Sequence, residues 1–120
     1  MSTKIFDRAT LLERLDGDVA MLEMLMEVYM KDVPNHLEAL TNAINAADKE
    51  LVRFHAHSLK GSSGNVGAVE MQTAAAALEK AELYDSPVQV RSAMDRIHQA
   101  FAALSRVLSP TASNPNRESI

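Results

Sequence analysis

Apolar residues recur along most of this chain at the three- and four-residue spacing of an amphipathic helix. The stripe that contains Leu22, Leu25 and Met26 is a clear example. Breaks in this pattern divide the chain into one short segment and four longer ones. The segments predicted to be helical are about residues 7–15, 19–47, 48–66, 68–83 and 87–108.

The residues between these segments are of the kinds that begin and end helices. Asp16–Gly17 interrupts the pattern after the first helix, and Gly67 is placed to end the third. Pro34 lies inside the second segment, where a proline either kinks the helix or starts a new one, which Asp32 could cap. The residues expected at helix starts are Asp7 or Thr10, Asp18, Asp48, and Ser86 followed by Pro87.

Strands have little support, because no stretch is rich in valine, isoleucine and threonine. Short links between long amphipathic helices favour antiparallel packing of successive helices. We therefore predict an all-α fold, an antiparallel four-helix bundle with a short additional N-terminal helix. The bundle is expected to occupy residues 5–109 as one domain, and residues 110–120 to form a disordered polar tail.

Composition narrows the functional class. The chain has 120 residues, 47% of them hydrophobic, which suits one modest core. Its net charge of −4 argues against a nucleic-acid partner, which would favour a basic face. The chain has no cysteine, no apolar run near the ~20 residues of a membrane span and no apolar signal-peptide core. We expect a cytoplasmic, monomeric protein with no membrane or nucleic-acid partner.

One face of the third predicted helix carries an unusual set of residues. His57 shares this face with Lys60 three residues on, Gly61 four on and Gly64 seven on. A glycine inside a helix costs about 1 kcal/mol relative to alanine, so two of them on one face need a reason. Gly64 lies near the helix end, whereas helix termination explains Gly61 poorly. This face offers an imidazole, a cation and room for a large partner.

A second histidine, His55, points in another direction. It falls close to Leu51 on the predicted inward face, nearly opposite His57, when each residue turns the helix by about 100°. We therefore expect His55 to be a core histidine with a hydrogen-bond partner, and the same geometry disfavours a His-x-His metal pair. His36 and His98 have no ligand pattern near them and are expected to be ordinary surface or boundary residues.

The His57 face suits phosphoryl transfer. A neutral imidazole is a nucleophile at neutral pH, since its unperturbed pKa is about 6.5. Lys60 would place a positive charge beside the anionic product, and Gly61 would leave room for it. The chain has neither a GxxxxGK[ST] nor a G-x-G-x-x-G loop, and no compact acidic set for a magnesium ion. We therefore predict that it is not an ATP-dependent kinase and that phosphate arrives from another protein.

Residues 57–68, His-Ser-Leu-Lys-Gly-Ser-Ser-Gly-Asn-Val-Gly-Ala, resemble the signature of histidine-containing phosphotransfer (HPt) domains. The family pattern, H-[ST]-[LIV]-K-G-[SA]-[SA]-x-N-[LIV]-G-[AL], is matched at every position. The resemblance implies a four-helix bundle with one exposed phosphoacceptor, here His57, modified on Nε2. It also implies that Lys60 steadies the phosphoryl group and that Gly61 permits close approach of the partner.

The resemblance covers about residues 5–108 and implies further roles by position. Glu79, on the next helix, is expected to accept a hydrogen bond from the other ring nitrogen of His57; an ordinary solvated glutamate is the alternative. HPt domains exchange phosphoryl groups with aspartates of receiver domains, which bring the Mg²⁺, so no cofactor of the chain's own is implied. Some residues are candidates for partner docking, although bundle core is the alternative for the leucines among them. These candidates are Phe54, Gly64, Leu11, Leu12, Leu15 and Leu22.

Three functions remain open from the sequence. The first, which we expect, is a phosphorelay intermediate that accepts a phosphoryl group from the receiver aspartate of a hybrid sensor kinase and passes it to a response-regulator aspartate. The second is the phosphoacceptor domain of a larger hybrid or chemotaxis-type histidine kinase. The third, a helical interaction domain whose His57 is never phosphorylated, would leave Lys60 and the two glycines without a reason.

Overall fold

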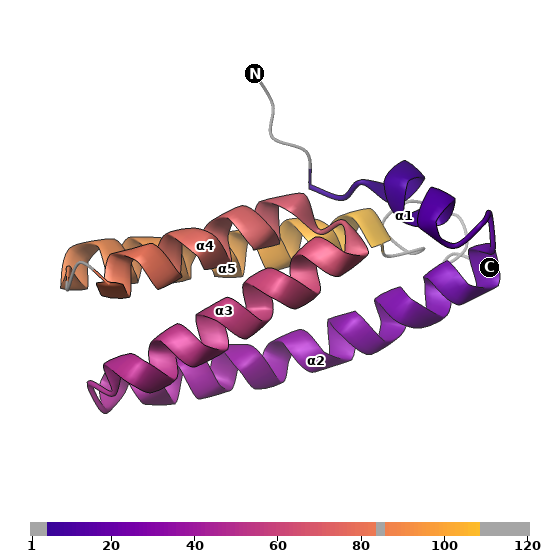
Figure 1. The fold of residues 1–120 in the computed structure, drawn as a ribbon. Helices are drawn as coiled ribbons and strands as arrows, with labels where there is room; N and C mark the ends of the chain where they lie inside the picture. The colour runs from indigo at the N-terminus through magenta and orange to yellow at the C-terminus, as the bar shows by residue number, and fades with distance from the viewer. Residues whose placement is uncertain (1–4, 84–85, 109–120) are drawn as a thin grey trace, which may run out of the picture.

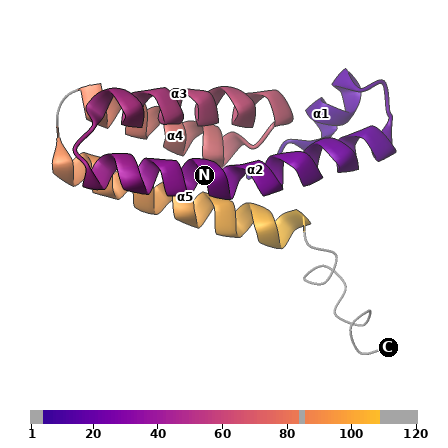
Figure 2. The same ribbon diagram turned by 90° about the horizontal axis from the view of Figure 1, so that it is seen from below.

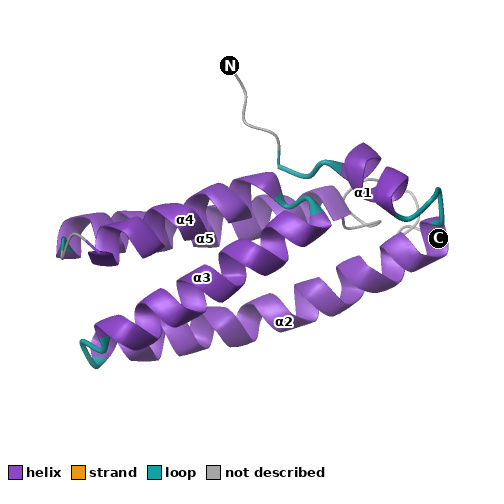
Figure 3. Cartoon of the chain, in the orientation of Figure 1, coloured by secondary structure: helices purple, strands orange, loops and turns teal. Residues whose placement is uncertain are grey.

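The structure is a computed structural model that describes residues 5–83 and 86–108 (Figure 1). All regular structure within these ranges is helical (Figure 3). The helices are α1 Arg8–Arg14, α2 Val19–Asn45, α3 Lys49–Val66, α4 Val69–Leu83 and α5 Pro87–Leu108. The predicted all-α bundle with a short additional N-terminal helix is confirmed. The tail predicted at residues 110–120 lies outside the described residues, so the domain limits stay a prediction.

The four long helices run alternately up and down in chain order (Figures 1 and 2). α3 packs against both α2 and α4, and α4 packs against α5. α1 lies at one end of the bundle, beside the start of α2 (Figure 1). The outward-facing residues of α3, among them Phe54 and His57, remain exposed.

The helix starts follow the sequence expectations. Three aspartates cap helices by accepting a hydrogen bond from the backbone three residues on: Asp7 for α1, Asp18 for α2 and Asp48 for α3. Ser86 accepts the N–H of Gln89 at 3.4 Å at the start of α5. Each cap satisfies a backbone N–H that has no partner within its own helix.

Gly67 ends α3 in the left-handed conformation, with φ of 77°. A Cβ at this position would lie 3.0 Å from the backbone oxygen of Asp7, so a side chain would be strained by conformation and by space. The N–H of Asp7 donates to the Gly67 carbonyl at 2.8 Å, and the N–H of Val69 donates to Ile5 at 3.1 Å. The segment before α1 is therefore fastened to the turn between α3 and α4.

The interpretation that a new helix starts near Pro34 is wrong. α2 runs through Pro34 as one helix of 27 residues. Proline removes one backbone hydrogen bond there, but the buried stripe continues across it from Val33 to Leu37 and Leu40, and this packing keeps the helix intact. Asp32 caps no helix; its carboxylate instead lies 3.1 Å from Nε2 of His36.

The buried face of α3 is displaced from the predicted one. Its buried residues are Val52, Ala56, Leu59, Ser63 and Val66. Leu51, predicted to point inward, is 41% exposed. The reason is that α3 packs against both α2 and α4, so the buried arc extends to Ala56 and Ser63.

His55 therefore lies at the edge of the core, not within it. Its side chain is half-buried, and its ring makes edge contacts with His36 and Phe54 at centroid distances of 5.9 and 5.2 Å. The expected hydrogen-bond partner is absent among the described residues, where the buried Nδ1 of His55 has none. The prediction of a hydrogen-bonded core histidine is wrong on both points.

A buried polar pair, which the sequence did not indicate, joins α2 to α3. The hydroxyls of Tyr29 and Ser63 share a hydrogen bond of 2.5 Å, and Ser63 is fully buried. Burial raises the pKa of the Tyr29 phenol to about 12; the nearby Asp32 carboxylate adds to this rise, and the hydrogen bond with Ser63 opposes it. Because both hydroxyls would be costly to bury unpaired, the pair favours one register of α3 on α2.

Candidate functional site

His57 lies on the outer surface of α3, as predicted. Its side chain is 69% exposed. Phe54, one turn before it, is 62% exposed, and Gly61, one turn after it, is also exposed. The three residues form an open surface on which the imidazole is accessible to a protein partner.

Glu79 of α4 connects two residues of this surface. Its Oε2 lies 2.9 Å from Nδ1 of His57, and its Oε1 lies 2.8 Å from Nζ of Lys60. The carboxylate is only 29% exposed, so it is largely sheltered between α3 and α4. The structure thus brings His57, Lys60 and Glu79 together, and Glu79 is more than a solvated surface residue.

This geometry selects one tautomer of the His57 ring. An ionised carboxylate can only accept hydrogen bonds, so Nδ1 must carry the proton that Glu79 receives. In the neutral ring the lone pair is then on Nε2. The nitrogen that can act as a nucleophile is therefore the one not held by Glu79.

Glu79 is stabilised in its ionised form. The hydrogen bond from Lys60 is the largest cause of a lowered pKa for this carboxyl; partial burial opposes it, and the contact with His57 lowers the pKa further. At neutral pH the carboxylate therefore remains an acceptor for both partners.

We expect the stability that Glu79 contributes to be lost in acid. A carboxyl whose pKa is lower in the folded state stabilises that state above its unfolded value, here 4.5, and loses the contribution as pH falls through the folded pKa. Urea unfolding of wild type and Glu79→Gln should therefore differ most at neutral pH, by about 1 kcal/mol or less, because solvent reaches the pair at the exposed His57 ring. Below about pH 4.5 the difference should shrink.

Glu38→Gln is the matched control for this experiment. Glu38 is an exposed glutamate on α2 that makes no ion pair among the described residues. The difference in unfolding free energy between Glu38→Gln and wild type should not shrink as the pH falls below about 4.5. A Glu79→Gln difference that stayed constant from pH 7 to pH 3 would contradict the assigned pair.

The two glycines of the site have different surroundings. A Cβ on Gly61 would have nothing within 4 Å, so no internal packing calls for glycine at this position. A Cβ on Gly64 would come 2.7 Å from Nε2 of Gln72, the far end of an exposed side chain on α4. Gly61 therefore leaves open space beside His57, whereas the space at Gly64 is taken by Gln72.

The docking leucines are placed differently from the sequence expectation. Leu11 and Leu22 are 2% and 3% exposed and belong to the core. The prediction that they contact a partner is therefore wrong. Leu12 and Leu15 are half-buried and pack against that core, and their part in docking stays a prediction. For Leu11 the alternative stated from the sequence, a place in the bundle core, is the one that the structure shows.

Other apolar side chains are exposed on α2 instead. Met24 is 60% exposed and Val28 is 62% exposed. Sequence reasoning missed them because it followed the buried stripe; the signal was that α2 also carries apolar residues between the stripe positions. Val28 lines a groove of about 480 Å³ between α2 and α3, together with Leu25, Ser62 and Asn65.

Within the described ranges, no group of three or more histidines, cysteines, aspartates or glutamates is arranged to hold a metal ion. In the same residues, no helix is both long enough and apolar enough to cross a membrane.

Comparisons with known proteins point to one family. Residues 24–107 match the sequence profile of the Hpt domain family. The chain is similar to the phosphorelay intermediate protein rdeA of Dictyostelium discoideum, with 34% identity over 65 residues, which are 54% of this chain and 26% of that protein. The chain thus spans about a quarter of that relative's length.

The fold is also shared with a solved protein. The crystal structure of histidine-containing phosphotransfer protein B (HptB) from Pseudomonas aeruginosa PAO1 superposes with a TM-score of 0.76 at 24% identity, over 85% of this chain and 89% of that one. At this identity the likeness establishes the fold. Because the family profile covers α3 with His57, most of α2 and all of α4, this chain belongs to the Hpt domain family.

Proposed function

We propose that this protein is a phosphorelay intermediate. It accepts a phosphoryl group on Nε2 of His57 from a receiver aspartate of a hybrid sensor kinase and passes it to a response-regulator receiver aspartate. The observation that carries the proposal is the 2.9 Å contact between Nδ1 of His57 and Glu79 on a ring that is 69% exposed. The similarity to a phosphorelay intermediate favours this function over a domain of a larger kinase.

The transfer step follows from the tautomer. The Nε2 lone pair of His57 attacks the phosphorus of an aspartyl phosphate, an N–P bond forms, and the O–P bond breaks with its electron pair left on the aspartate. Nδ1 keeps its proton, so the ring becomes cationic, and the Glu79 carboxylate at 2.9 Å offsets that charge. The reverse step returns the group to a second receiver, so one site serves both directions.

Lys60 is suited to steady the transferred group. Its Nζ is held 2.8 Å from Glu79, on the same face as His57 and three residues from it. An incoming phosphoryl group brings two or more negative oxygens, which can draw Nζ from the single carboxylate oxygen. Phosphoryl transfer depends mainly on positioning and on neutralising such charge, and Lys60 supplies a cation for both.

The apolar surface between α2 and α3 is the proposed docking area for the receiver. Phe54, Met24 and Val28 are each more than half exposed and lie outside the buried core. Large exposed apolar side chains gathered beside a reactive group are typical of interaction surfaces. We propose that Gly61 lies where the partner's backbone or phosphate comes closest.

The protein is proposed to need no nucleotide and no metal of its own. The receiver is expected to bring Mg²⁺ bound to its own carboxylates. Purified protein with labelled ATP and Mg²⁺ alone should therefore gain no label. Intrinsic labelling under these conditions would contradict the relay role.

Phosphotransfer from receivers tests the function directly. Receiver domains from the same genome, each phosphorylated with labelled acetyl phosphate or by its cognate kinase, are mixed with the purified protein. At least one should lose label to the protein within minutes, and the label should be acid-labile and base-stable. If none donates phosphate, and none accepts it from a chemically phosphorylated protein, the proposed function is wrong.

Lys60→Ala should slow this transfer without unfolding the protein. The side chain is 34% exposed and makes one ion pair, so its loss should change the free energy of unfolding by about 1 kcal/mol or less. Loss of its charge beside the phosphoryl group should lower the transfer rate by about 10- to 100-fold. The transfer rate is measured in reactions stopped at successive times, at increasing receiver concentration. Thermal unfolding measures the change in stability.

Arg96→Ala is the control, because Arg96 also makes one ion pair with a glutamate, Glu70, but between α5 and α4. It should change neither the unfolding transition nor the transfer rate appreciably. A large drop in the unfolding temperature of Lys60→Ala would instead make Lys60 a structural residue.

A further inference from the structure

A second cleft borders the site on the side opposite the apolar groove. It lies between α3 and α4, has a volume of about 260 Å³, and is lined by Arg53, Lys60, Ala76, Glu79 and Lys80. Three of these five residues are cations and one is an anion. The chain as a whole has a net charge of −4, so this concentration of positive charge is local.

The cations of the cleft differ in their partners. Lys60 is paired with Glu79. Arg53 and Lys80 are both exposed, and neither makes a hydrogen bond or ion pair among the described residues. Because Glu79 is already shared between His57 and Lys60, the two outer charges are available to an external anion.

The position of Arg53 ties the cleft to the reactive histidine. Arg53 precedes His57 by four residues on α3, so both lie on one face, about 6 Å apart along the helix axis. Lys80 directly follows Glu79 on α4, across the cleft from Arg53. His57 therefore has apolar residues on its α2 side and positive residues on its α4 side.

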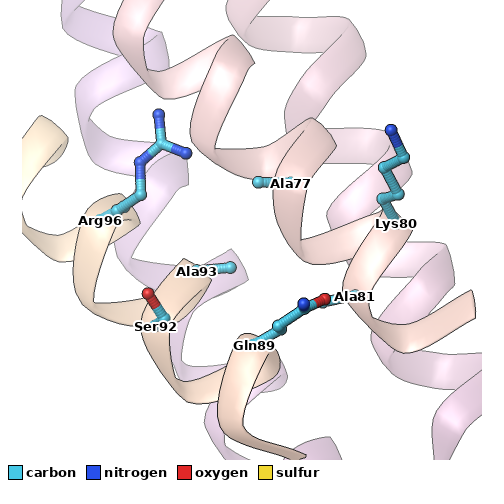
Figure 4. Close-up of a pocket in the computed structure, with 7 residues that line it drawn as sticks. All are labelled: Ala77, Lys80, Ala81, Gln89, Ser92, Ala93 and Arg96. Atoms are coloured by element: carbon cyan, nitrogen blue, oxygen red, sulfur yellow. The ribbon is translucent and has the colours of Figure 1, made fainter. Parts of the chain in front are cut away.

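Lys80 lines both this cleft and a neighbouring pocket on the other side of α4. That second pocket lies between α4 and α5 and is lined by Ala77, Ala81, Ser92 and Arg96 as well as Lys80. Figure 4 shows the amino group of Lys80 well apart from Ser92 and Arg96 of α5. Arg96 is occupied by an ion pair with Glu70 at 3.2 Å, so that pocket has no second free cation to offer an anion.

We propose that Arg53 and Lys80 form a cationic rim that recognises the acidic residues around the phosphoacceptor aspartate of a docked receiver; this rests on the proposed function. A receiver that holds Mg²⁺ must gather carboxylates around that ion, because Mg²⁺ prefers oxygen ligands. Such a negative surface meets a positive rim when the aspartate faces His57. Opposite charges at the edge of an interface speed association and orient the partner.

This role differs from that of Lys60. The rim charges act on the encounter, and long-range attraction of this kind is screened by salt over about 8 Å at physiological ionic strength. They should therefore set the receiver concentration needed for transfer and its salt dependence. Lys60 should set the rate of transfer once the receiver is bound.

The test compares a neutralised rim with a matched neutralised surface. Arg53→Gln/Lys80→Gln removes the two rim charges. Arg91→Gln/Arg106→Gln removes two exposed arginines of α5 that make no ion pair among the described residues, and it changes the net charge equally. Each protein is checked for helix content by circular dichroism, and transfer is measured against concentration with the phosphorylated receiver that wild type uses best.

For the rim variant we expect the receiver concentration at half-maximal rate to rise about tenfold at 50 mM salt. The effect should fall to less than twofold at 500 mM salt, the maximal rate should stay within twofold of wild type, and the α5 control should match wild type throughout. An unchanged half-maximal concentration overturns the proposal, as does an equal rise in the control. A lower maximal rate with an unchanged half-maximal concentration also overturns it, because the two cations would then act on the phosphoryl group.

Failure of the proposed function gives a different result. In that case wild type exchanges phosphate with no receiver, and both proposals fall together. If wild type exchanges phosphate and the rim variant behaves as wild type does, the relay function stands and only the proposed rim is wrong.

Discussion

His57→Gln should carry no acid-labile, base-stable phosphate under any condition in which wild type is labelled by a receiver. Glutamine can still donate a hydrogen bond to Glu79, but it has no ring nitrogen to form the N–P bond. The side chain of His57 is 69% exposed, so the substitution should change the free energy of unfolding by less than about 0.5 kcal/mol. Loss of label with an unchanged unfolding curve would assign the chemistry to this residue.

The other histidines of the same region are the controls. His55 lies two residues away, half-buried at the edge of the core, and His36 is paired with Asp32. His55→Gln and His36→Gln should both remain fully labelled once they are folded. Label that persists in His57→Gln, or that disappears only in His55→Gln, would move the phosphoacceptor to another nitrogen and remove the basis of the tautomer argument.

The sequence predicted most of the fold because local signals and packing agree along this chain. Aspartates stand where helices begin, and Gly67 stands where α3 must turn. Pro34 shows the limit of that approach. Its local preference favours a break, but the apolar stripe on both sides of it is buried against the bundle, and the packing of α2 decides the outcome.

The buried face of α3 shows a second limit. A helical wheel built from apolarity alone places Leu51 and His55 inward, whereas the structure buries Ala56 and Ser63. Small residues give little hydrophobic signal, yet they are the ones over which neighbouring helices approach. The buried partner of Ser63, Tyr29, lies 34 residues away in the chain, which no local pattern can reveal.

The residues of the candidate site also differ in how far the sequence could predict them. His57, Lys60 and Gly61 share a face of one helix, so their spacing was sufficient to bring them together. The pairing with Glu79 required the family resemblance, because α4 packs on α3 at a register that spacing does not give. Lys80 could be associated with Arg53 only once the cleft between α3 and α4 was known.

Gly61 offers a test in which stability and function should move in opposite directions. A Cβ at this position meets nothing within 4 Å, so Gly61→Ala should strengthen the helix without a clash. We expect a gain of about 0.5–1 kcal/mol in the free energy of unfolding and a rise of about 4 °C in the unfolding temperature. Phosphotransfer should nevertheless slow by about 10- to 100-fold, because the methyl group holds the partner's phosphoryl group away from Nε2.

Side-chain size separates this explanation from a general stiffening of the helix. Alanine and leucine have similar, high helix propensities, so Gly61→Ala and Gly61→Leu should be about equally stable, while the larger side chain should slow transfer further. Gly64→Ala provides the comparison one turn on, since its Cβ would meet the movable end of Gln72 and not open space. Gly64→Ala should gain less unfolding free energy than Gly61→Ala, and its transfer rate should fall less. Equal transfer rates for glycine, alanine and leucine at position 61 would show that no partner approaches this surface, and the docking geometry proposed around His57 would have to be abandoned.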